Sequence, residues 1–430
     1  MKIAFVLDNI RENIDYSNYD IPNPGIGGTQ FLIWTVSSSL AERNNGLDIY
    51  LFSEKKSGFS RALNIIEETD IIKCIKICSE LKIDYLVLRG PFLKKEIFNA
   101  IDKYKVKTIM WSHNFENYIT LKNCQLSKYL KKNICVSYEQ LDLLRDTNLY
   151  SKSTAIYNGI NFSHFDNIEV KPHRYRVCYI GNLYPQSGYE TIIDAWKHVQ
   201  KKFPQAELVI IGGNNLYDIN KMKSAYSKKS FENLKKKEER VFIGSSGKLK
   251  DSIKFVGVRG GIDKLKIMAS SYVGVANITI AGDTFGLAAV EFEALGVPVV
   301  SINKYGVRET VSNGETGILV DKKSQLANAI CELLENEDLH NKYSIEGKKF
   351  ARKNFSIDKI ILEWEEFFLN VDEDKGIYTR DNLFTYNGKR ILLLNAKLRN
   401  IPALKNIPPI LFYKYLKYGL RRILQKLNLI

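Results

Sequence analysis

Short apolar runs alternate with longer segments of helical period along the first part of the chain. The opening run is KIAFVL at 2–7, and an amphipathic segment follows from Gly28. Further predicted strands are DIYLFSE (48–54), DYLVLRG (84–90), KTIMWSH (107–113), NICVS (133–137) and STAIYNG (153–159). Strands that alternate with helices are typical of a parallel sheet with helical crossovers. This part therefore predicts a doubly wound α/β domain.

The same pattern starts again after a linker near NIEVKPHR (167–174). The predicted strands are RVCYIGNL (176–183), AELVIIGG (206–213), SIKFVGV (252–258), SYVGVANI (271–278) and PVVSIN (298–303), with a helix over YETIIDAWKHVQKKF (189–203). The lysine-rich residues 214–254 are expected to hold a solvated pair of helices. The second part predicts another doubly wound sheet.

These patterns divide the 430 residues into two domains, over 1–170 and 171–355. A cleft between them would gather the loops at the carboxyl ends of the strands, where open α/β sheets bind ligands. A helix within 356–371, over DKIILEWEEFFLNV, is expected to cross back onto the first domain. Residues 372–430 form a tail.

The stretch TIAGDTFGLAAVEFEALGVPVV (279–300) places carboxylates on an apolar helix. We expect the helix from Phe285 to Leu295, because Gly296 and Pro298 stop it, and a strand over 297–300. Glu291 then shares a face with Leu287, Ala288, Ala294 and Leu295. A carboxylate in such surroundings needs a partner.

Two interpretations of this stretch stay open on its residues alone. In the first, Asp283 caps the helix and Glu291 reaches solvent at an edge. In the second, the helix N-terminus takes a phosphate and the two carboxylates take sugar hydroxyls, which is a nucleotide-sugar site.

The formal charge of +15 is concentrated in the tail. Residues 382–430 contain no Asp or Glu and ten basic residues: Lys389, Arg390, Lys397, Arg399, Lys405, Lys414, Lys417, Arg421, Arg422 and Lys426. Charge in one amphipathic tail, without an aromatic and basic RNA motif, argues against a nucleic-acid partner. The six cysteines form no CxxC pair, so neither zinc nor a disulfide framework is indicated, and a reduced cytoplasmic setting is expected.

The end of the tail, ILFYKYLKYGLRRILQKLNLI (410–430), has the form of an interfacial basic helix. One stripe of this predicted helix carries Lys414, Lys417, Arg421 and Gln425, and another stripe carries Leu416, Leu420, Leu424 and Leu427. We expect 389–430 to bind an anionic membrane surface, which places the protein at the inner face of the cell membrane. The alternative is a helix packed on the protein body or on a partner. The apolar run at the N-terminus is too short for a signal peptide.

The order of motifs over residues 1–370 resembles the retaining nucleotide-sugar glycosyltransferases of family 4, which have the two-domain GT-B fold. Phe285-Gly286, Glu291 and the Gly296-Val297-Pro298 entry to the strand match the family signature, and Asp283 stands where the family has its first Glu. The resemblance implies that Glu291 holds the ribose hydroxyls. It also implies that Asp283 lies beside the transferred sugar as a catalytic residue.

Other motifs follow in the family's order. The resemblance implies a second catalytic residue, His113 in WSHNFE, aimed at the donor sugar. The remaining positions implied to contact the donor are Gly27, Gly28, Thr29, Asn182, Ser187, Gly257, Arg259, Thr284, Phe285, Gly286, Leu287 and Arg308. The family has an Arg and a Lys on the diphosphate where this chain has Asn182 and Ser187, so Arg259 and Arg308 are expected to bring compensating charge.

The resemblance implies transfer of a hexosyl-type sugar with retention, from a nucleotide sugar, with UDP favoured, to a glycan or lipid-linked glycan acceptor. Assembly of a bacterial surface polysaccharide is the implied setting, and no metal or other cofactor is expected. In such enzymes the first domain faces the acceptor and the second holds the donor. The missing cations favour one alternative, a catalytically degenerate GT-B subunit that binds glycan or a partner protein. A dinucleotide oxidoreductase is disfavoured, because the first strand is not followed by a GxGxxG turn.

Overall fold

The computed structural model describes the whole chain except residues 9, 11–13, 44–45, 57, 91–92, 186, 214–227, 280–281, 373–386, 415, 418–419 and 421–430. The chain divides into two compact units. Unit 1 consists of Met1–Tyr19, Ile33–Tyr157 and Glu363–Ile430. Unit 2 consists of Asp20–Leu32 and Asn158–Leu362. Asp20–Leu32 thus joins unit 2 although the sequence expectation puts it in the first domain.

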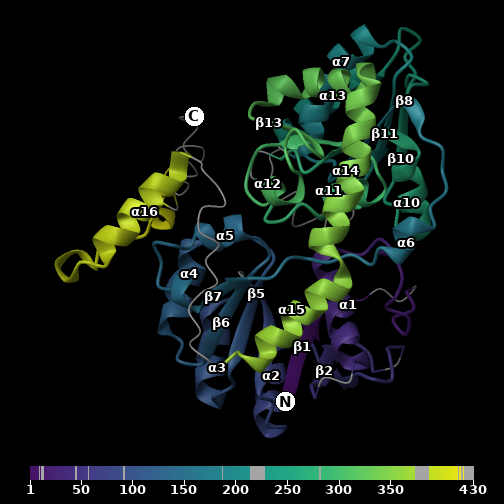
Figure 1. The fold of residues 1–430 in the computed structure, drawn as a ribbon. Helices are drawn as coiled ribbons and strands as arrows, with labels where there is room; N and C mark the ends of the chain where they lie inside the picture. The colour runs from purple at the N-terminus through teal and green to yellow at the C-terminus, as the bar shows by residue number, and fades with distance from the viewer. Residues whose placement is uncertain are drawn as a thin grey trace. The chain divides into compact units, whose positions relative to one another are not determined.

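Unit 1 is built on a parallel sheet of seven strands in the order β3-β2-β1-β4-β5-β6-β7 (Figure 1). The strands are β1 (Lys2–Leu7), β2 (Asp48–Ser53), β3 (Asn64–Glu67), β4 (Tyr85–Gly90), β5 (Thr108–Ser112), β6 (Leu130–Cys135) and β7 (Ser153–Ala155). Phe5 pairs with Leu51 on one side and Val87 on the other, so the strand order reverses at β1. The expected strands are present, and β3 is an addition whose short polar-ended sequence gives little strand signal.

The helices of unit 1 are α1 (Gly28–Glu42, which begins in unit 2), α2 (Ile71–Glu80), α3 (Lys95–Tyr104), α4 (Tyr118–Leu126), α5 (Tyr138–Asp142) and the 3₁₀ turn η1 (Tyr150–Lys152). The expected helix over 358–371 is α15 (Ile357–Leu369). Its Trp364 ring lies 4.8 Å from that of Trp111 in β5 and 6.3 Å from that of Phe5 in β1. The second half of α15 therefore belongs to the core of unit 1.

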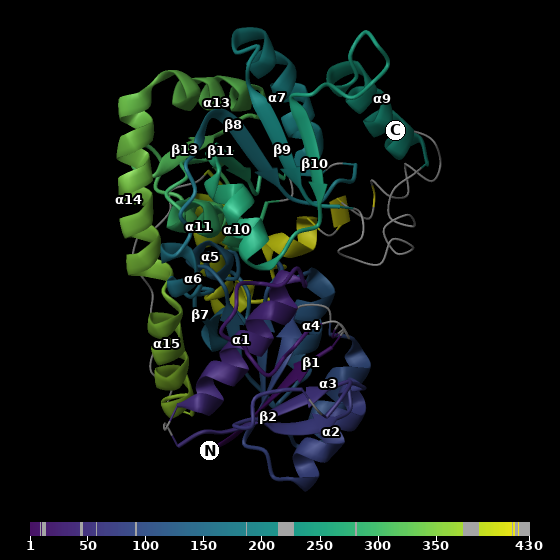
Figure 2. The same cartoon turned by 90° about the vertical axis from the view of Figure 1, so that its right-hand side faces the viewer.

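Unit 2 contains a parallel sheet of six strands in the order β10-β9-β8-β11-β12-β13. The strands are β8 (His173–Ile180), β9 (Glu207–Ile211), β10 (Ile253–Gly257), β11 (Ser271–Ala276), β12 (Val299–Ile302) and β13 (Gly317–Val320). Figure 2 shows β8, β9 and β10 side by side with α7 (Gly188–Lys202) next to them. Cys178 pairs with Val209 on one side and Gly274 on the other, so the strand order reverses at β8.

The other helices of unit 2 are α6 (Ser163–Asp166), α9 (Lys228–Phe242), α10 (Gly261–Ala269), α11 (Leu287–Ala294), α12 (Val307–Thr310), the 3₁₀ turn η2 (Lys323–Gln325), α13 (Leu326–Glu335) and α14 (Glu337–Phe355). Of the helix pair expected over 214–254 the structure describes α9, and 214–227 lie outside the described residues. The largest side chains buried in this core include Trp196 and Phe292.

Two expected boundaries in the 279–300 stretch are corrected. The helix begins at Leu287 rather than Phe285, because Gly286 has a φ of 101° and cannot continue a right-handed helix. The strand begins at Val299 rather than Val297, because Pro298 cannot donate to a strand ladder. The expectation that Gly296 ends the helix is confirmed, since Gly296 follows it with a φ of 73°.

The described tail includes α16 (Asn387–Arg399), the 3₁₀ turn η3 (Pro402–Leu404) and the helical residues 410–414, 416–417 and 420. The predicted helix over 410–430 is therefore described only in its first part, and Arg421, Leu424, Gln425 and Leu427 lie outside the described residues. Among the helices that are described, none has the length and apolarity that crossing a bilayer requires.

Candidate functional site

The carboxyl edge of the unit 2 sheet gathers most of the predicted donor-binding residues. The strand order reverses between β8 and β11, and ligands of open α/β sheets bind at such a switch point. Asn182 follows β8, and Asn277 follows β11. The N-terminus of α7 reaches this edge, since a Cβ at Gly188 would lie 2.6 Å from the Ile278 side chain. Loops of several strands therefore meet at one place.

Glu291 on α11 forms a buried ion pair with Lys264 on α10. The Lys264 Nζ lies 2.5 Å from the Glu291 Oε1, and the two residues are 6% and 7% exposed. This contact overturns the interpretation in which Glu291 reaches solvent. It supplies the partner that the apolar helix face requires. Lys264 lies one turn before the buried Met268 and therefore on the apolar face of α10. A lysine on such a face was the signal in the sequence that could have identified the partner of Glu291.

Asp283 lies in the loop before α11 and is partly exposed. The Asn277 Nδ2 donates to its Oδ2 over 3.2 Å, and the helix has no side-chain cap, so the capping interpretation of Asp283 is wrong. Burial raises the pKa of the Asp283 carboxyl, and the hydrogen bond from Asn277 opposes the rise. Asn277 has a φ of 56°, a backbone conformation that Asn tolerates better than most residues. Sequence reasoning did not identify Asn277.

Close backbone packing holds the loop that carries Asp283. The Gly306 N–H donates to the Asp283 carbonyl over 3.1 Å, and a Cβ at Gly306 would lie 2.0 Å from the Thr284 carbonyl oxygen. The Thr310 hydroxyl donates to the Phe285 carbonyl over 3.2 Å. These contacts fix Asp283 and the residues that lead into α11, which are Thr284, Phe285, Gly286 and Leu287.

Glu293 is a second buried carboxylate on α11, and sequence reasoning missed it. It is 1% exposed, and the Thr316 hydroxyl donates to its Oε1 over 2.5 Å. Burial raises its pKa well above the ordinary value. It faces α14, where a Cβ at Gly347 would lie 3.5 Å from the Glu293 side chain. Glu293 is therefore part of the helix packing rather than of the carboxyl edge.

Ser187 and Asn182 occupy the turn where the resemblance expects two cations. The Ser187 hydroxyl donates to the Tyr184 carbonyl over 2.6 Å and accepts from the Tyr189 N–H over 3.2 Å, so it is the N-cap of α7. Ser187 is buried, and Asn182 is partly exposed. The side chain of Ser187 thus stabilises the helix start.

The two arginines proposed as replacements differ in their surroundings. The Arg308 Nε donates to the Asn303 Oδ1 over 2.8 Å and its Nη2 donates to the Asn303 carbonyl over 2.9 Å, so its guanidinium holds the loop after β12. Arg259 is exposed, and its Nη1 donates to the Val258 carbonyl over 3.3 Å. Arg259 follows Gly257 at the end of β10 and is the more accessible of the two cations.

The glycine-rich segment with Gly27, Gly28 and Thr29 lies in unit 2 beside the start of α10. The Gly261 N–H donates to the Asn23 carbonyl over 2.7 Å. A Cβ at Gly260 would lie 2.1 Å from the carbonyl carbon of Pro24. The structure therefore places this segment, which leads into α1, next to the loop after β10.

His113 belongs to unit 1, where it directly follows β5. Its ring lies 4.4 Å from that of Trp111, and burial, aided by the charge of Arg89, lowers its pKa to about 3. The imidazole is therefore neutral near pH 7. His113 thus belongs to unit 1, whereas the predicted donor-binding residues at the carboxyl edge belong to unit 2.

Glu116 follows three residues after His113 and is a buried carboxylate that sequence reasoning did not single out. It is 5% exposed, and the Gln140 Nε2 donates to its Oε1 over 3.4 Å. Burial raises its pKa to about 7, against hydrogen bonds that lower it. Gln140 also donates to the carbonyls of Ser112 and Asn114, so it ties Glu116 to the end of β5.

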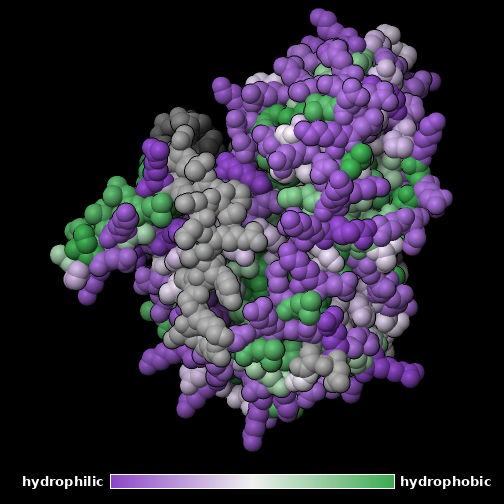
Figure 3. Space-filling model, in the orientation of Figure 1, coloured by the Kyte–Doolittle hydropathy of each residue, from purple (hydrophilic) through white to green (hydrophobic). Residues whose placement is uncertain are grey.

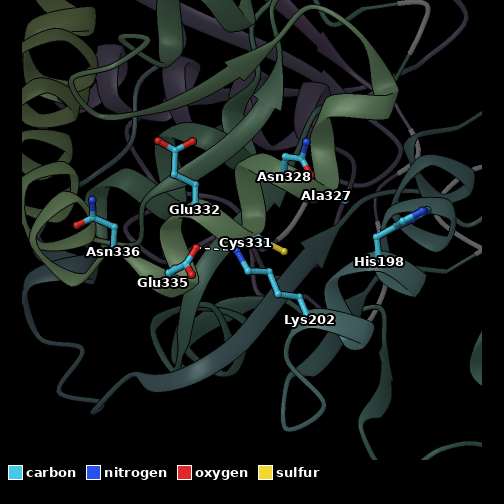
Figure 4. A pocket seen from close by; sticks show the side chains of 8 residues that line it. All are labelled: His198, Lys202, Ala327, Asn328, Cys331, Glu332, Glu335 and Asn336. Atoms are coloured by element: carbon cyan, nitrogen blue, oxygen red, sulfur yellow. Dashed lines mark hydrogen bonds and ion pairs between the residues drawn. The ribbon is translucent and has the colours of Figure 1, made fainter.

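A separate hollow of about 550 Å³ lies between α7 and α13 in unit 2. Figure 4 shows that Lys202 and Glu335 meet across it, and their N–O distance is 2.6 Å. A helix that follows a parallel strand ends at the edge of the sheet where the strands begin. Lys202 ends α7 and Glu335 ends α13, so their contact lies at that edge. This hollow is therefore not the donor site expected at the carboxyl edge.

Comparison with known proteins shows what this part of the chain is similar to. Residues 162–350 match the family model of the glycosyl transferases group 1. This part of the chain is similar to a group 1 glycosyltransferase domain. That domain covers the loops after β8, β10, β11 and β12, and the resemblance drawn from the motifs is confirmed.

Proteins named as glycosyltransferases are similar to longer parts of the chain. An uncharacterized glycosyltransferase of Haemophilus influenzae is 23% identical over 388 residues, which cover 85% of this chain and 99% of that protein. The capsular polysaccharide biosynthesis glycosyltransferase CapM of Staphylococcus aureus is 26% identical over 252 residues, 56% of this chain and 58% of CapM.

Solved structures share the fold. The crystal structure of Anabaena Alr3699/HepE in complex with UDP-glucose covers 86% of this chain and 100% of its own, with a TM-score of 0.64 and 16% sequence identity. The GT-B fold class expected from the sequence, with two Rossmann-like parallel sheets, is confirmed.

Proposed function

We propose that this glycosyltransferase moves a hexosyl-type sugar from a UDP-sugar to a glycan acceptor with retention of configuration. The observation that carries the proposal is the placement of Asp283 and Glu291, eight positions apart, on the loop and helix that follow β11 at the switch point of a group 1 domain. Asp283 is partly exposed, whereas Glu291 is fixed by Lys264. The two carboxylates therefore suit different roles.

The reaction develops positive charge on the sugar ring and negative charge on the leaving diphosphate. Asp283 lies where a carboxylate favours the oxocarbenium-like ring, and Asn277 orients it. The N-termini of α7 and α11 and the backbone of the glycine segment offer N–H groups to the diphosphate. Glu291, held in one position by its ion pair, is suited to accept hydrogen bonds from vicinal ribose hydroxyls. The proposal needs no cofactor besides the donor.

The UDP moiety and the acceptor rest on similar proteins. The Anabaena structure contains UDP-glucose, and CapM acts in capsular polysaccharide biosynthesis by its name. We extend both to this chain and propose an acceptor glycan, lipid-linked, in the assembly of a bacterial surface polysaccharide. The predicted cytoplasmic location at the inner face of the membrane belongs to the same proposal.

The test is thermal melting against UDP, GDP, ADP and CMP, followed by release of nucleotide from matching sugar donors, for the wild type and Asp283→Asn. Binding to the folded state raises the melting temperature. We expect stabilisation by UDP in both proteins and at least a hundredfold slower donor turnover in the variant. Turnover that is unchanged in Asp283→Asn would remove this carboxylate from the mechanism.

A second candidate, a GT-B subunit that binds without catalysis, is favoured by one set of contacts. The Ser187 hydroxyl caps α7, and the Arg308 guanidinium is hydrogen-bonded to Asn303. Neither side chain therefore replaces the cations that the family places on the diphosphate. For this candidate, UDP-sugars are neither hydrolysed nor transferred by the wild type. A pull-down on immobilised glycan or a search for a partner protein would then follow.

A further inference from the structure

One face of the tail is docked on unit 1. The Asn395 Nδ2 on α16 donates to the Asp146 Oδ2 over 2.8 Å, and the Ile410 N–H donates to the same oxygen over 2.6 Å. The rings of Phe412 and Tyr118 lie 4.8 Å apart. Leu392 and Asn395 are buried, so the face of α16 that carries them is its inner face. This favours the interpretation that the tail packs on the protein body, for the part of it that is described.

The exposed side of α16 carries apolar side chains that the described residues of unit 1 leave accessible to solvent. Ile391 and Leu394 are 57% and 59% exposed, and Arg390 and Lys397 beside them are exposed as well. We call these four residues the outer face. Figure 3 shows apolar surface on α16, at the left of the view. Exposed apolar side chains that gather on one side of a helix mark a site of interaction.

The described residues that follow α16 in the sequence repeat the chemistry of the outer face. Beyond α16, Ile401, Leu416 and Leu420 are exposed apolar residues, and Lys405 and Lys417 are exposed cations. The sequence has no Asp or Glu from residue 382 to residue 430. Apolar side chains interleaved with cations, without any carboxylate, match the surface of an anionic bilayer. The same charge disfavours a second copy of this chain, because two such faces repel each other.

We propose that the outer face of α16 docks on an anionic lipid surface, while its inner face stays latched to unit 1 through Asp146. Ile391 and Leu394 enter the interfacial region, and Arg390 and Lys397 contact the lipid phosphates. The latch holds α16 at a fixed place on unit 1, so docking orients that unit at the membrane. This proposal does not rest on the donor site, and it provides a place where a lipid-linked acceptor meets the enzyme.

The experiment is flotation of the full chain with vesicles of phosphatidylcholine, alone or equimolar with phosphatidylglycerol. The test variant is Ile391→Glu with Leu394→Glu. The matched control is Ile345→Glu with Leu362→Glu, two similarly exposed apolar residues, 56% and 53%, elsewhere in the chain. We expect the wild type and the control to float with the anionic vesicles only, and the test variant to bind at least tenfold more weakly. Lys397→Gln with Arg390→Gln should weaken binding about fivefold per cation.

Four results would overturn the proposal. They are equal flotation of the test variant and the wild type, equal binding to both vesicle types, no binding of the wild type, or a wild-type dimer in sedimentation that the test variant makes monomeric. The last result would assign the outer face to a second copy. UDP-dependent melting, measured on every variant, checks that the donor site and the fold are intact, so failure here is distinguishable from failure of the proposed function.

Discussion

The ammonium group of Lys264 and the carboxylate of Glu291 meet 2.5 Å apart inside unit 2, although 27 positions separate them in the sequence. Both side chains are more than nine-tenths buried. A buried pair of this kind is costly to break from one side, because the remaining charge has neither water nor a partner. A substitution of Glu291 alone therefore affects the stability of unit 2 as well as the proposed donor site.

We predict that Glu291→Ala lowers the free energy of unfolding by roughly 3 to 5 kcal/mol. The joint change Lys264→Met with Glu291→Leu should leave it unchanged or raise it by about 1 to 4 kcal/mol, because it removes both charges. Chemical denaturation of each protein measures this. The exposed pair Lys349 and Glu346 is the control, since its double alanine variant should lose less than about 1 kcal/mol. A single variant as stable as the wild type would contradict the prediction.

Asn182→Arg should strengthen UDP binding. The change returns a guanidinium to the turn after β8, where a charge-assisted hydrogen bond to a phosphate is worth about 1.5 to 3 kcal/mol, or roughly tenfold or more in affinity. Asn182 is partly exposed, so the longer side chain has access to solvent. Calorimetric titration with UDP measures the effect, with Asn182→Gln as the uncharged control. Equal affinity in both variants would place the diphosphate away from this turn.

Gly260→Ala should displace the glycine-rich segment from unit 2. Its Cβ would lie 2.1 Å from the Pro24 carbonyl carbon and 2.2 Å from the Gly25 nitrogen, and backbone atoms cannot rotate away. We expect a loss of about 1 to 3 kcal/mol and faster limited proteolysis within 20–32. Gly244→Ala, whose Cβ would have only ordinary contacts, is the control. Protection of 20–32 in both variants would show that the segment is held by other contacts.

Glu116→Gln should flatten the pH dependence of stability. The pKa of Glu116 in the folded protein is about 7, against an ordinary value of 4.5, so the folded state binds this proton more tightly. The stabilisation is fully present below about pH 4.5 and is lost as the pH rises through about 7. At 1.36 kcal/mol per pKa unit, the loss is about 3 kcal/mol.

Chemical denaturation near pH 5 and pH 8 measures this effect as a difference between proteins. The wild type should lose about 2.5 kcal/mol more than Glu116→Gln between the two conditions, because a part of the full loss already occurs below pH 5. Contributions from Glu293 and Asp283, whose pKa values are also raised, are common to both proteins and cancel. Equal losses would mean that Glu116 titrates as an exposed carboxylate does.

The amphipathic and apolar runs of the sequence determined the order of strands and helices, because the period of burial is a local property. KIAFVL, DYLVLRG and SYVGVANI each hold a strand, and each is buried on both faces of a parallel sheet. The spacing of Asp283, Gly286 and Glu291 left two interpretations open on its own, and the glycosyltransferase prediction came from the resemblance of the ordered motifs over residues 1–370.

Only the tertiary structure decided which groups meet. Lys264 became the partner of Glu291 through the packing of α10 against α11, and Asn277 rather than a helix N–H became the partner of Asp283. Glu116 lies in an ordinary-looking loop sequence, and its hydrogen-bond partner Gln140 comes from another element. Periodicity shows that a side chain points inward. The pairing of inward side chains depends on contacts between segments far apart in the chain, which the sequence does not order by itself.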